Sequence, residues 1–353
     1  MTSIPLALIG VDHPHATDWY GTLARVSELT PVAHYDPQPE KAKKLIAPPY
    51  DTLPVYGDVG ELLARHRVQA ALVMLPLKHG VEVMLPLAKA GVHMMAEKPV
   101  ARSADDLQPV ASALQPGTVF YSGYAWRFDA IVRQVKTLID EDILGRLWSI
   151  EMRWITSKVG RRPGIPAHRD PDSYLFRREI SRGGMLQWLG CHWLDLMCHL
   201  AGEPVAAVAA MTARQTSDEI EVEDMAVCLL RYKSGMLGTL HVGYLLPAGG
   251  DTFLGIRGSL GWMRWDCEAG RRFTVHSEHP SWAASPTRVF DFPRGPDPSY
   301  GAGTGAALLR DFARCINDGG QNPTLTIADA LRVLHILDAA YAAAASGHET
   351  PVA

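Results

Sequence analysis

The sequence predicts an α/β domain with a doubly wound, Rossmann-like parallel sheet, followed by an α+β domain with a largely antiparallel open sheet. The first 122 residues alternate short apolar runs with helical patterns, as βαβ units do. The later chain contains consecutive strand-like segments without helices between them, which is typical of antiparallel sheets. A length of 353 residues fits two domains. We expect these domains to span residues 1–122 and 123–353.

The first domain is predicted to contain five strands: Leu6–Ile9, Pro31–Tyr35, Ala70–Leu75, His93–Glu97 and Val119–Ser122. Between them, apolar residues spaced three and four positions apart predict amphipathic helices over Val59–Arg65, His79–Ala90 and Ala104–Leu114. Gly91 follows one of these helices at the position of a C-cap. The order of strands and helices predicts a doubly wound sheet.

After Phe128 the pattern changes. A helix over Ala130–Asp142 precedes a long strand, Leu147–Ile155, and a polar loop, and a second helix covers Met185–Leu200. Six strand-like segments follow: Ala206–Thr212, Met225–Tyr232, Met236–Tyr244, Phe253–Arg257, Gly261–Asp266 and Phe273–His276. A loop rich in Gly and Pro and two helices, Ala306–Asn317 and Ile327–Ser346, end the chain. One face of the antiparallel sheet is expected to stay uncovered, which predicts a homodimer or homotetramer through that face.

Composition excludes several classes of partner. The chain has 34 Lys and Arg against 38 Asp and Glu, for a net charge of -4, and no block of like charge, so nucleic acid is not expected to bind. No apolar run approaches the ~18 residues of a membrane span, and the N-terminal stretch lacks the basic region of a signal peptide. Five scattered cysteines without a CxxC pair fit reduced thiols. We therefore expect a cytoplasmic protein.

Gly10 ends the first strand and is followed by Val-Asp-His-Pro-His-Ala. In a dinucleotide-binding fold this turn is rich in glycine, which lets the backbone approach a pyrophosphate at the helix N-terminus. Here Asp12 and His15 stand where the second and third glycines would be. Two interpretations stay open: a phosphate-binding turn, or a turn whose Asp and His cap the next helix.

Three further groups follow the ends of predicted parallel strands, where open α/β sheets form their ligand crevice. Asp36 follows the second strand, where a carboxylate would accept hydrogen bonds from an adenosine ribose and repel a 2′-phosphate; it could also cap the helix that includes Glu40. Pro76 and His79 follow the strand Ala70–Leu75, and Glu97-Lys98-Pro99 ends the next one. Lys98 could stabilise negative charge on a substrate oxygen, or be an ordinary loop lysine.

These residues resemble the Gfo/Idh/MocA oxidoreductases (glucose-fructose oxidoreductase and inositol dehydrogenase types), and the resemblance covers nearly the whole chain. It is carried by Asp36, Pro76, His79, Glu97-Lys98-Pro99 with the upstream Ala90-Gly91-Val92-His93, Arg127-Phe128, and the helical tail through Ala339-Ala340-Tyr341. The family's second signature, a Gly-Gly pair followed by Asp-x-Gly-x-His-x-x-Asp, corresponds to the segment from Gly183 to Asp195. His192 and Asp195 match this signature, whereas Trp188 occupies the position of its first Asp.

The resemblance implies an NAD(P)-dependent oxidoreductase that acts on a sugar, a cyclitol or a derivative, with NAD as the cofactor and NADP not excluded. It implies that Lys98 and His192 face the nicotinamide, and that His192 takes the hydroxyl proton as hydride leaves the carbon, a role that suits imidazole. Candidate cofactor-binding residues are Gly10, Asp12, His13, His15, Asp36, Pro76, His79, Glu97 and Lys98. Candidate substrate-binding residues are Trp126, Arg127, Trp188 and Asp195, and the Trp188 indole could stack on a sugar. A relative that has lost redox chemistry and senses a carbohydrate or nucleotide is the alternative.

Two histidine clusters could be interpreted as metal sites. His13-Pro14-His15 is similar to the paired histidines of metal-dependent hydrolases, although those need a full (β/α)₈ barrel that the strand pattern does not support. His192, Asp195 and His199 share one face of a predicted helix. We expect no metal at either place.

Cationic residues also gather ahead of the signature helix: Arg153, Arg161, Arg162, His168, Arg169, Arg177, Arg178 and Arg182. In a ligand crevice they would favour an acidic or phosphorylated substrate, and a solvated loop or a subunit contact is the alternative. Trp126, Trp154, Trp188 and Trp193 are either sugar platforms or core.

Overall fold

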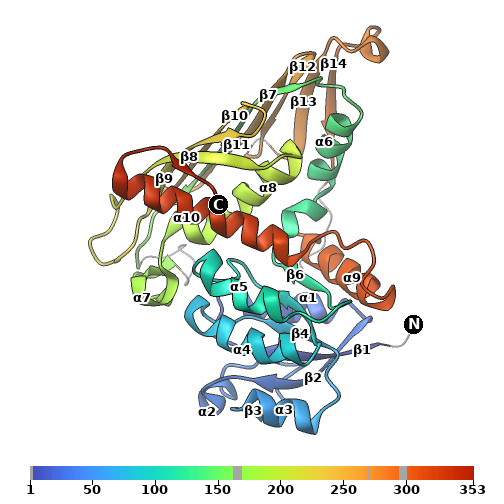
Figure 1. Ribbon diagram of the computed structural model, residues 1–353, viewed down its shortest axis with the longest axis vertical. Coiled ribbons are helices and arrows are strands. Elements are labelled where there is room, and N and C mark those ends of the chain that lie inside the picture. The colour runs from blue at the N-terminus through green and yellow to red at the C-terminus, as the bar shows by residue number, and fades with distance from the viewer. Residues whose placement is uncertain (1–2, 162–168, 269, 294–299) are drawn as a thin grey trace. The chain divides into compact units, whose positions relative to one another are not determined.

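The computed structural model describes residues 3–161, 169–268, 270–293 and 300–353 (Figure 1). Contacts between residues divide the chain into two compact units. Unit 1 contains Met1–Ala125, Glu179–Ser181 and Gly295–Arg332, and unit 2 contains Trp126–Arg178, Arg182–Arg294 and Val333–Ala353. Of the predicted elements, the helix that was expected over Ala306–Asn317 therefore belongs with the N-terminal half of the chain, a return that no sequence pattern indicated. Residues Arg162 and His168, in the cationic stretch, lie outside the described residues.

Unit 1 is built on a six-stranded sheet in the order β3-β2-β1-β4-β5-β6. Its strands are β1 (Ile4–Ile9), β2 (Leu29–Tyr35), β3 (Val55–Tyr56), β4 (Ala70–Val73), β5 (His93–Ala96) and β6 (Phe120–Ser122). Every neighbouring pair is parallel, which confirms the predicted Rossmann sheet. The strand order reverses at β1 and β4, and such a switch point is where open α/β sheets bind ligands.

In the described part of unit 1, five helices connect these strands, and a sixth, α9 (Thr304–Asn317), returns from later in the chain. The five are α1 (Ala16–Leu23), α2 (Pro39–Ala42), α3 (Val59–Arg65), α4 (Leu77–Lys89) and α5 (Ala104–Ala113). Asp58 and Ser103 cap α3 and α5, because their side chains accept hydrogen bonds from backbone N–H groups in the first turn. The returning helix α9 packs against α1, and Tyr121 at the end of the sheet donates a hydrogen bond to Asp311 on α9 at 2.6 Å.

Unit 2 is built on a nine-stranded sheet in the order β14-β13-β12-β11-β7-β10-β9-β8-β15. Its strands are β7 (Leu147–Ser157), β8 (Val205–Ala213), β9 (Met225–Tyr232), β10 (Leu237–Leu246), β11 (Gly250–Gly258), β12 (Gly261–Asp266), β13 (Arg272–Ser277), β14 (Thr287–Asp291) and β15 (Thr350–Pro351). The sheet is antiparallel except where β10 pairs with β7. That pair is parallel, because the chain between them returns through α7, α8, β8 and β9.

Helices cover one face of this sheet (Figure 1). They are α6 (Ala130–Asp140), α8 (Cys191–Ala201) and the part of α10 (Ile327–Ser346) that belongs to unit 2; the short α7 (Arg178–Ser181) belongs to unit 1 after Arg178. A π-helical turn, Leu186–Gly190, leads into α8, so the predicted helix over Met185–Leu200 is present but begins with a wider turn. α8 packs on β7 and β10. Gly202, in the left-handed conformation, caps the C-terminus of α8.

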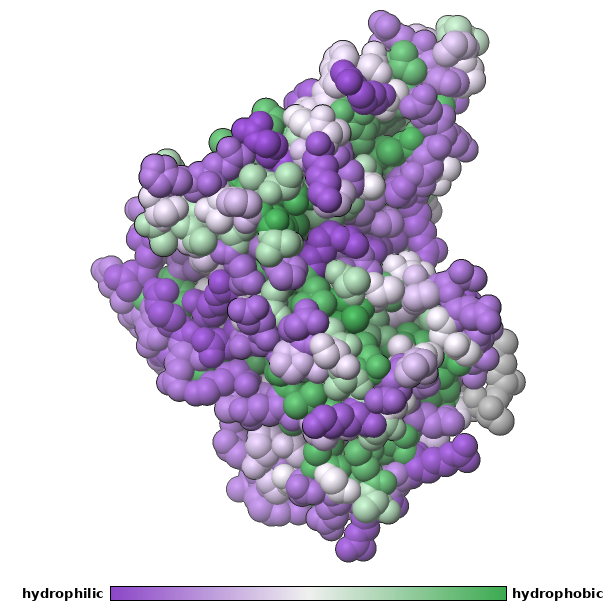
Figure 2. All heavy atoms as spheres, viewed as in Figure 1, coloured by the Kyte–Doolittle hydropathy of each residue, from purple (hydrophilic) through white to green (hydrophobic). Residues whose placement is uncertain are grey.

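The surface is mixed. Figure 2 shows hydrophilic residues over much of the viewed face, with hydrophobic residues in separate patches. Among the described residues, no helix is both long enough and apolar enough to span a membrane.

Candidate functional site

The turn after β1 runs directly against the end of β4. Gly10 has φ +87°, and a Cβ atom at this position would lie 2.8 Å from both the Leu75 Cδ2 atom and the Met74 carbonyl oxygen. Glycine is therefore required here for two reasons, its backbone angle and the close approach. The turn ends at His15, which precedes α1 without a side-chain capping bond, and the Asp12 carboxylate instead pairs with Lys41 at 2.8 Å. The capping interpretation of this turn is wrong.

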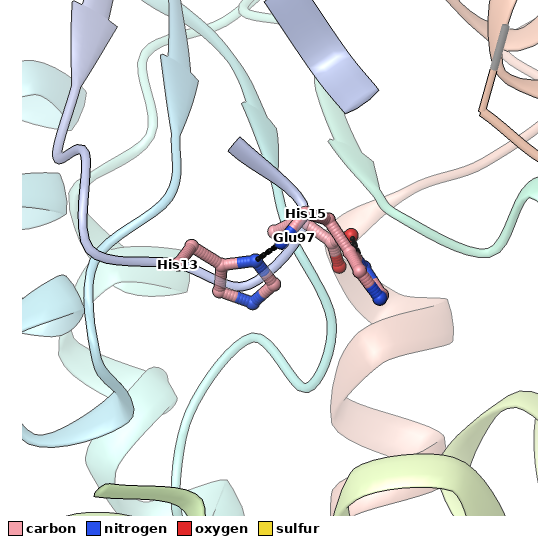
Figure 3. Close-up of side chains that lie close together, drawn as sticks. All are labelled: His13, His15 and Glu97. Carbon is pink, nitrogen blue, oxygen red and sulfur yellow. Dashed lines mark hydrogen bonds and ion pairs between the residues drawn. The ribbon is translucent and has the colours of Figure 1, made fainter. Parts of the chain in front are cut away.

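His13 and His15 come together with Glu97, which follows β5 (Figure 3). The His15 Nδ1 atom lies 2.8 Å from Glu97 Oε1, and the His15 backbone N–H donates to His13 Nδ1 at 3.1 Å. Trp19 Nε1 also donates to Glu97 Oε1, at 3.0 Å. Tyr300, from the returning segment, stacks on Trp19 with ring centroids 4.6 Å apart and tilts against His15. Sequence reasoning missed Trp19 and Tyr300, because they belong to segments that only the fold brings together.

The Glu97 carboxylate is buried and ionised. Burial alone would raise its pKa, but the positive charge of Lys98, with His15 and His13, holds the pKa well below the usual range. Its Oε2 atom also accepts a hydrogen bond from the Lys98 backbone N–H. Lys98 is itself fully buried, with 0% of its surface exposed. The motif therefore places a buried cation next to a buried counter-ion at the carboxyl end of β5.

His13, His15 and Glu97 could also be considered as metal ligands. Their ligand atoms lie within 4.8 Å of one another, and they form the one such group in the part of the chain that the structure describes. Both Glu97 oxygens already accept hydrogen bonds, from Lys98 N–H on one side and from His15 and Trp19 on the other. These three hydrogen bonds leave the carboxylate about one of its four lone-pair sites, and His15 Nδ1 already faces Glu97. The arrangement therefore fits a hydrogen-bonded network better than an open ligand set, and the absence of a metal stays a prediction.

Asp36 lies beside the same turn. Its Oδ1 atom accepts from the Gln38 backbone N–H at 2.8 Å and its Oδ2 atom from the Val11 N–H at 3.3 Å. Burial raises its pKa, and the two backbone hydrogen bonds oppose that shift. A carboxylate has about four lone-pair sites, so Asp36 can still accept hydrogen bonds from a ribose. Gln38 rather than Asp36 precedes α2 as its N-cap, so the helix-cap interpretation of Asp36 is wrong.

Pro76 and His79 lie at the carboxyl end of β4. Pro76 is the N-cap of α4, and its carbonyl oxygen accepts hydrogen bonds from the His79 and Gly80 backbone N–H groups. The His79 ring is about half exposed and lies 3.7 Å from Glu82. His79 is therefore on the same sheet edge as Glu97 but is not part of the His13–His15–Glu97 cluster.

In unit 2, α8 carries His192 and Asp195. His192 is buried, with 5% of its surface exposed. The Asp195 carboxylate forms a bidentate ion pair with Arg127: Nε donates to Oδ2 at 2.9 Å and Nη2 donates to Oδ1. Both side chains are buried. Two of the predicted substrate-binding residues are thus brought together, and their pairing fixes α8 against the chain that precedes α6.

Three tryptophans gather beside His192. The rings of Trp154 and Trp193 stack with centroids 4.5 Å apart, and Trp126 tilts against Trp193 at 5.1 Å. Trp126 and Trp154 are partly exposed, whereas Trp188, in the π-helical turn, is only 4% exposed. The partly exposed rings offer more surface for a sugar than Trp188 does.

The Gly-Gly pair positions this helix. A Cβ atom at Gly183 would lie 1.8 Å from the Tyr341 hydroxyl, and one at Gly184 would lie 1.9 Å from the Glu223 carbonyl oxygen. Glu223 Oε1 accepts hydrogen bonds from Gly184 N–H, from Leu186 N–H and from the Tyr341 hydroxyl. Burial raises the pKa of Glu223. Sequence reasoning missed Glu223 and Tyr341 as the residues that hold the start of the signature helix.

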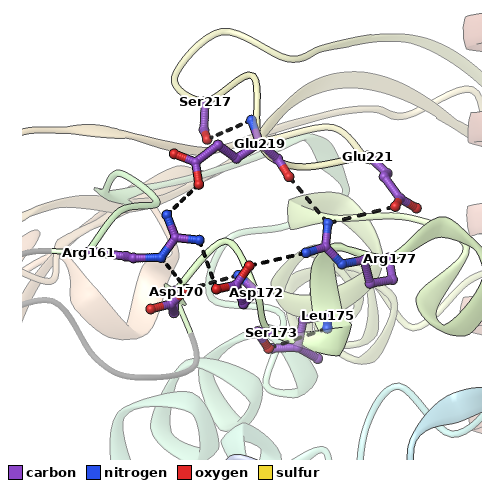
Figure 4. A network of polar contacts seen from close by, with 9 residues as sticks. All are labelled: Arg161, Asp170, Asp172, Ser173, Leu175, Arg177, Ser217, Glu219 and Glu221. Carbon is purple, nitrogen blue, oxygen red and sulfur yellow. Dashed lines mark hydrogen bonds and ion pairs between the residues drawn. The ribbon is translucent and has the colours of Figure 1, made fainter.

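Most described cations of the arginine-rich stretch have carboxylate partners. In the network of Figure 4, Arg161 contacts Asp170 at 3.2 Å, Asp172 at 2.9 Å and Glu219. Arg177 lies 3.4 Å from Asp172 and 3.7 Å from Glu221. Arg153 pairs with Asp251, and Arg182 pairs with Asp338. These side chains mainly join loops of unit 2, which agrees with the interpretation of the cationic stretch as a solvated loop.

Comparison with known proteins places this geometry in a family. Residues 5–122 match an oxidoreductase family with an NAD-binding Rossmann fold, and residues 132–264 match the GFO/IDH/MocA C-terminal domain. An oxidoreductase subunit from Amycolatopsis mediterranei is 25% identical over 363 residues, which cover 98% of this chain and 97% of that protein. Myo-inositol 2-dehydrogenase from Thermotoga maritima is 28% identical over 210 residues, 58% of this chain and 59% of its own. A levoglucosan dehydrogenase structure in complex with NADH and levoglucosan has the same fold, with a TM-score of 0.84 and 20% identity over 99% of this chain and 100% of that one.

Proposed function

The chain belongs to the GFO/IDH/MocA family of NAD-binding oxidoreductases, and from this premise we propose that it transfers a hydride between NAD and a hydroxyl or carbonyl carbon of a sugar, a cyclitol or a derivative. The single observation that carries the proposal is the fully buried Lys98, with its counter-ion Glu97, at the carboxyl end of β5 in the NAD-binding domain. A buried cation at that edge suits an oxygen that gains negative charge. The relatives named for inositol and levoglucosan support the substrate class.

The residues of unit 1 fit a dinucleotide. Gly10 allows the close turn that a phosphate requires, and Asp36 keeps acceptor capacity for the adenosine ribose. We assign Asp12, His13 and His15 to the pyrophosphate side of this turn, where a glycine-rich turn would offer backbone alone. Pro76, His79 and Glu97 follow the neighbouring strands and are assigned to the nicotinamide end of the cofactor.

Lys98 and His192 are the proposed catalytic residues. NAD, when bound, accepts the hydride that leaves the reacting carbon. In that direction His192 takes the hydroxyl proton, since imidazole is a base near neutral pH. Lys98 donates a hydrogen bond to the same oxygen and stabilises its developing charge. The C–H electron pair and the O–H proton then leave separately and a carbonyl group remains.

Trp126, Arg127, Trp188 and Asp195 are assigned to the substrate side. The ion pair of Arg127 and Asp195 positions α8, so we expect both to act mainly by holding His192 in place. Trp126 offers a partly exposed ring for the apolar face of a sugar. Trp188 is buried where other members of the family are expected to have an acid, which gives this chain a different surface near His192.

We also propose a homodimer or homotetramer in the cytoplasm, formed through the sheet of unit 2. Five large apolar side chains are exposed on the sheet face opposite its core: Met211, Leu229, Leu237, Trp262 and Val289. Cross-strand pairing places Leu229, Thr239 and Glu151 in one row, and Leu237 and Arg257 in the next. Apolar residues on an uncovered sheet face favour association with another copy.

Titration with NADH and NADPH, followed by the fluorescence of the nine tryptophans, tests the proposal. We expect both nucleotides to quench the tryptophan fluorescence, and NADH to bind more tightly than NADPH because Asp36 opposes a 2′-phosphate. NADH binding without turnover of any sugar or cyclitol would favour the sensor alternative. No binding of either nucleotide at millimolar concentration would refute the dehydrogenase proposal.

A further inference from the structure

Arg169 differs from most of the other described arginines of the cationic stretch; the exposed Arg178 also has no carboxylate paired with its guanidinium in the described structure, and donates to the Glu221 carbonyl oxygen instead. No carboxylate among the described residues pairs with Arg169, whereas Arg153, Arg161, Arg177 and Arg182 each have one. Residues 162–168, which precede it and are not described, contain no Asp or Glu. Residues 162–168 therefore contribute no carboxylate side chain that could be a counter-ion for Arg169.

The guanidinium of Arg169 is nevertheless largely buried. Its Nη1 atom donates to the Thr156 hydroxyl at 3.2 Å, to the Ser157 carbonyl oxygen at 3.1 Å and to the Ser157 hydroxyl. Its Nε atom is buried, and no acceptor in the described structure meets it. The plane lies over the Tyr244 ring, 5.3 Å from the centroid. Burial lowers the pKa of Arg169, as expected for a cation without a neighbouring anion. Burying a cation in this way is unfavourable unless an anion completes the site.

Arg169 lies on the same side of the sheet as the proposed substrate residues of unit 2. Thr156 and Tyr244 are cross-strand neighbours on β7 and β10, the two strands on which α8 packs. Trp154 precedes Thr156 by two residues on β7, so both point to one face about 6.6 Å apart. Trp154 in turn stacks on Trp193, the neighbour of His192 on α8. A chain of contacts within unit 2 thus links Arg169 to the helix that carries His192.

Buried N–H donors that lack an acceptor in the described structure gather near Arg169 and α8. The indole Nε1 atoms of Trp154 and Trp193 are buried, and within the described part of the chain neither has a hydrogen-bond acceptor. Together with Arg169 Nε they make three N–H groups that lack an acceptor. An arrangement of this kind disfavours a cation and favours a ligand that brings oxygen acceptors and negative charge.

We propose that Arg169 selects the substrate by binding a carboxylate on it, so that the enzyme acts on a sugar acid such as a hexuronate rather than on a neutral sugar. The inference rests on the proposed dehydrogenase function and names its substrate class. Arg169 Nη2, which makes no protein hydrogen bond in the described structure, donates to the carboxylate while Nη1 stays on Thr156 and Ser157. Arg169 is a specificity residue and takes no part in proton or hydride transfer.

Calorimetric titration of the NADH complex with matched pairs tests this inference: D-glucuronate against D-glucose, and D-galacturonate against D-galactose. We expect at least one acid to bind at least tenfold more tightly than its neutral partner. Arg169→Met should remove that preference while leaving the affinities for NADH and for the neutral sugar unchanged, and Arg169→Lys should keep part of it. Arg177→Met, which removes a loop arginine that already has carboxylate partners, is the matched control and should keep the full preference.

Three results would overturn the inference. The wild type could bind acid and neutral sugar equally; Arg169→Met could keep the preference; or Arg169→Met could weaken both sugars alike and lower the melting temperature, which marks a structural role. Tighter binding of D-glucose 6-phosphate than of either uronate, with the same dependence on Arg169, would replace the carboxylate with a phosphate. NADH affinity is measured separately. A protein that does not bind NADH would refute the proposed dehydrogenase function, and this result is distinguishable from every result above.

Discussion

Lys98 in unit 1 and Arg169 in unit 2 are two cations with opposite surroundings. In unit 1, the buried Lys98 has Glu97 beside it, and the Glu97 oxygens accept hydrogen bonds from His15, Trp19 and the Lys98 backbone. In unit 2, the half-buried Arg169 has hydroxyl and carbonyl partners but no carboxylate in the described structure, whereas the buried Arg127 of the same unit is paired with Asp195.

The charge of Lys98 is neutralised by a protein carboxylate once the chain has folded, whereas the charge of Arg169 has no carboxylate partner in the described part of the chain and is open to neutralisation by a ligand. Charges that neutralise each other are held in place before any ligand arrives, which is the preorganisation that electrostatic catalysis requires. A donor-rich surface without an anion reaches its lowest free energy only when a ligand supplies one. The comparison therefore assigns the Glu97–Lys98 pair to catalysis and Arg169 to recognition, and the variants below test that division.

The largest effect is expected from His192→Ala. Loss of a positioned general base lowers kcat by roughly 10²-fold to 10⁴-fold, while the affinity for NADH should change little. Steady-state kinetics over a range of pH, with NADH affinity measured separately, checks both expectations. His199→Ala, on the same helix, is the control. Equal losses of kcat in the two variants would mean that α8 matters for structure and that His192 has no special role.

Lys98→Met is expected to lower kcat by about 10²-fold to 10³-fold, because the lost hydrogen bond is made to charge that develops in the transition state. The exposed Lys89→Met variant should behave as the wild type. A rise in KM with kcat unchanged would assign Lys98 to ground-state binding instead.

Glu97→Gln removes the counter-ion of a buried lysine, and we expect a loss of about 3 kcal/mol in the free energy of unfolding. Because the folded-state pKa of Glu97 is lowered, its contribution is present above the unfolded pKa of about 4.3 and is lost as the pH falls, by up to about 1.4 kcal/mol per pH unit. Urea unfolding of the wild type and the variant between pH 6 and pH 3 measures this difference. The exposed Glu82→Gln variant is the control, and a gap that stays constant with pH would contradict the ionised, buried state of Glu97.

The smallest change concerns Asp36. Asp36→Asn should shift the ratio of NADPH to NADH affinity towards NADPH by roughly tenfold, since it removes a negative charge next to the 2′ position. Parallel fluorescence titrations of the variant and of the exposed Asp51→Asn control determine the two ratios. An unchanged ratio in Asp36→Asn would remove Asp36 from the ribose site.

The long, periodic elements could be predicted from the sequence, and the short or tertiary ones could not. The helix Ile327–Ser346 and the strands Met225–Tyr232 and Gly261–Asp266 have the predicted bounds, because each carries a clear periodic pattern. β3 and β15 contain two residues each, too few for any pattern, and β14 was also missed. The parallel pairing of β7 with β10 depends on a long crossover that strand patterns do not indicate.

For the site, local motifs identified Lys98, Glu97, His15 and Asp36, because each follows a strand end whose position is readable. Their partners were not readable. Tyr300 reaches His15, and Tyr341 reaches Glu223, only through the return of distant segments to their units. Likewise, the sequence shows eight cations in one stretch, and only the fold separates Arg169 from those that already have a carboxylate.

The central claim, hydride transfer between this chain's cofactor and a sugar carbon, is tested most directly by an isotope experiment. The enzyme is incubated with NAD⁺ and the best sugar substrate, in which the hydrogens bonded to ring carbons are replaced by deuterium. Proton NMR then measures the deuterium content at C4 of the nicotinamide. The account predicts one deuterium at C4 for each carbonyl group formed, and loss of this transfer in Lys98→Met and His192→Ala. Product formed with unchanged NAD⁺, or with the label released to water, would contradict it.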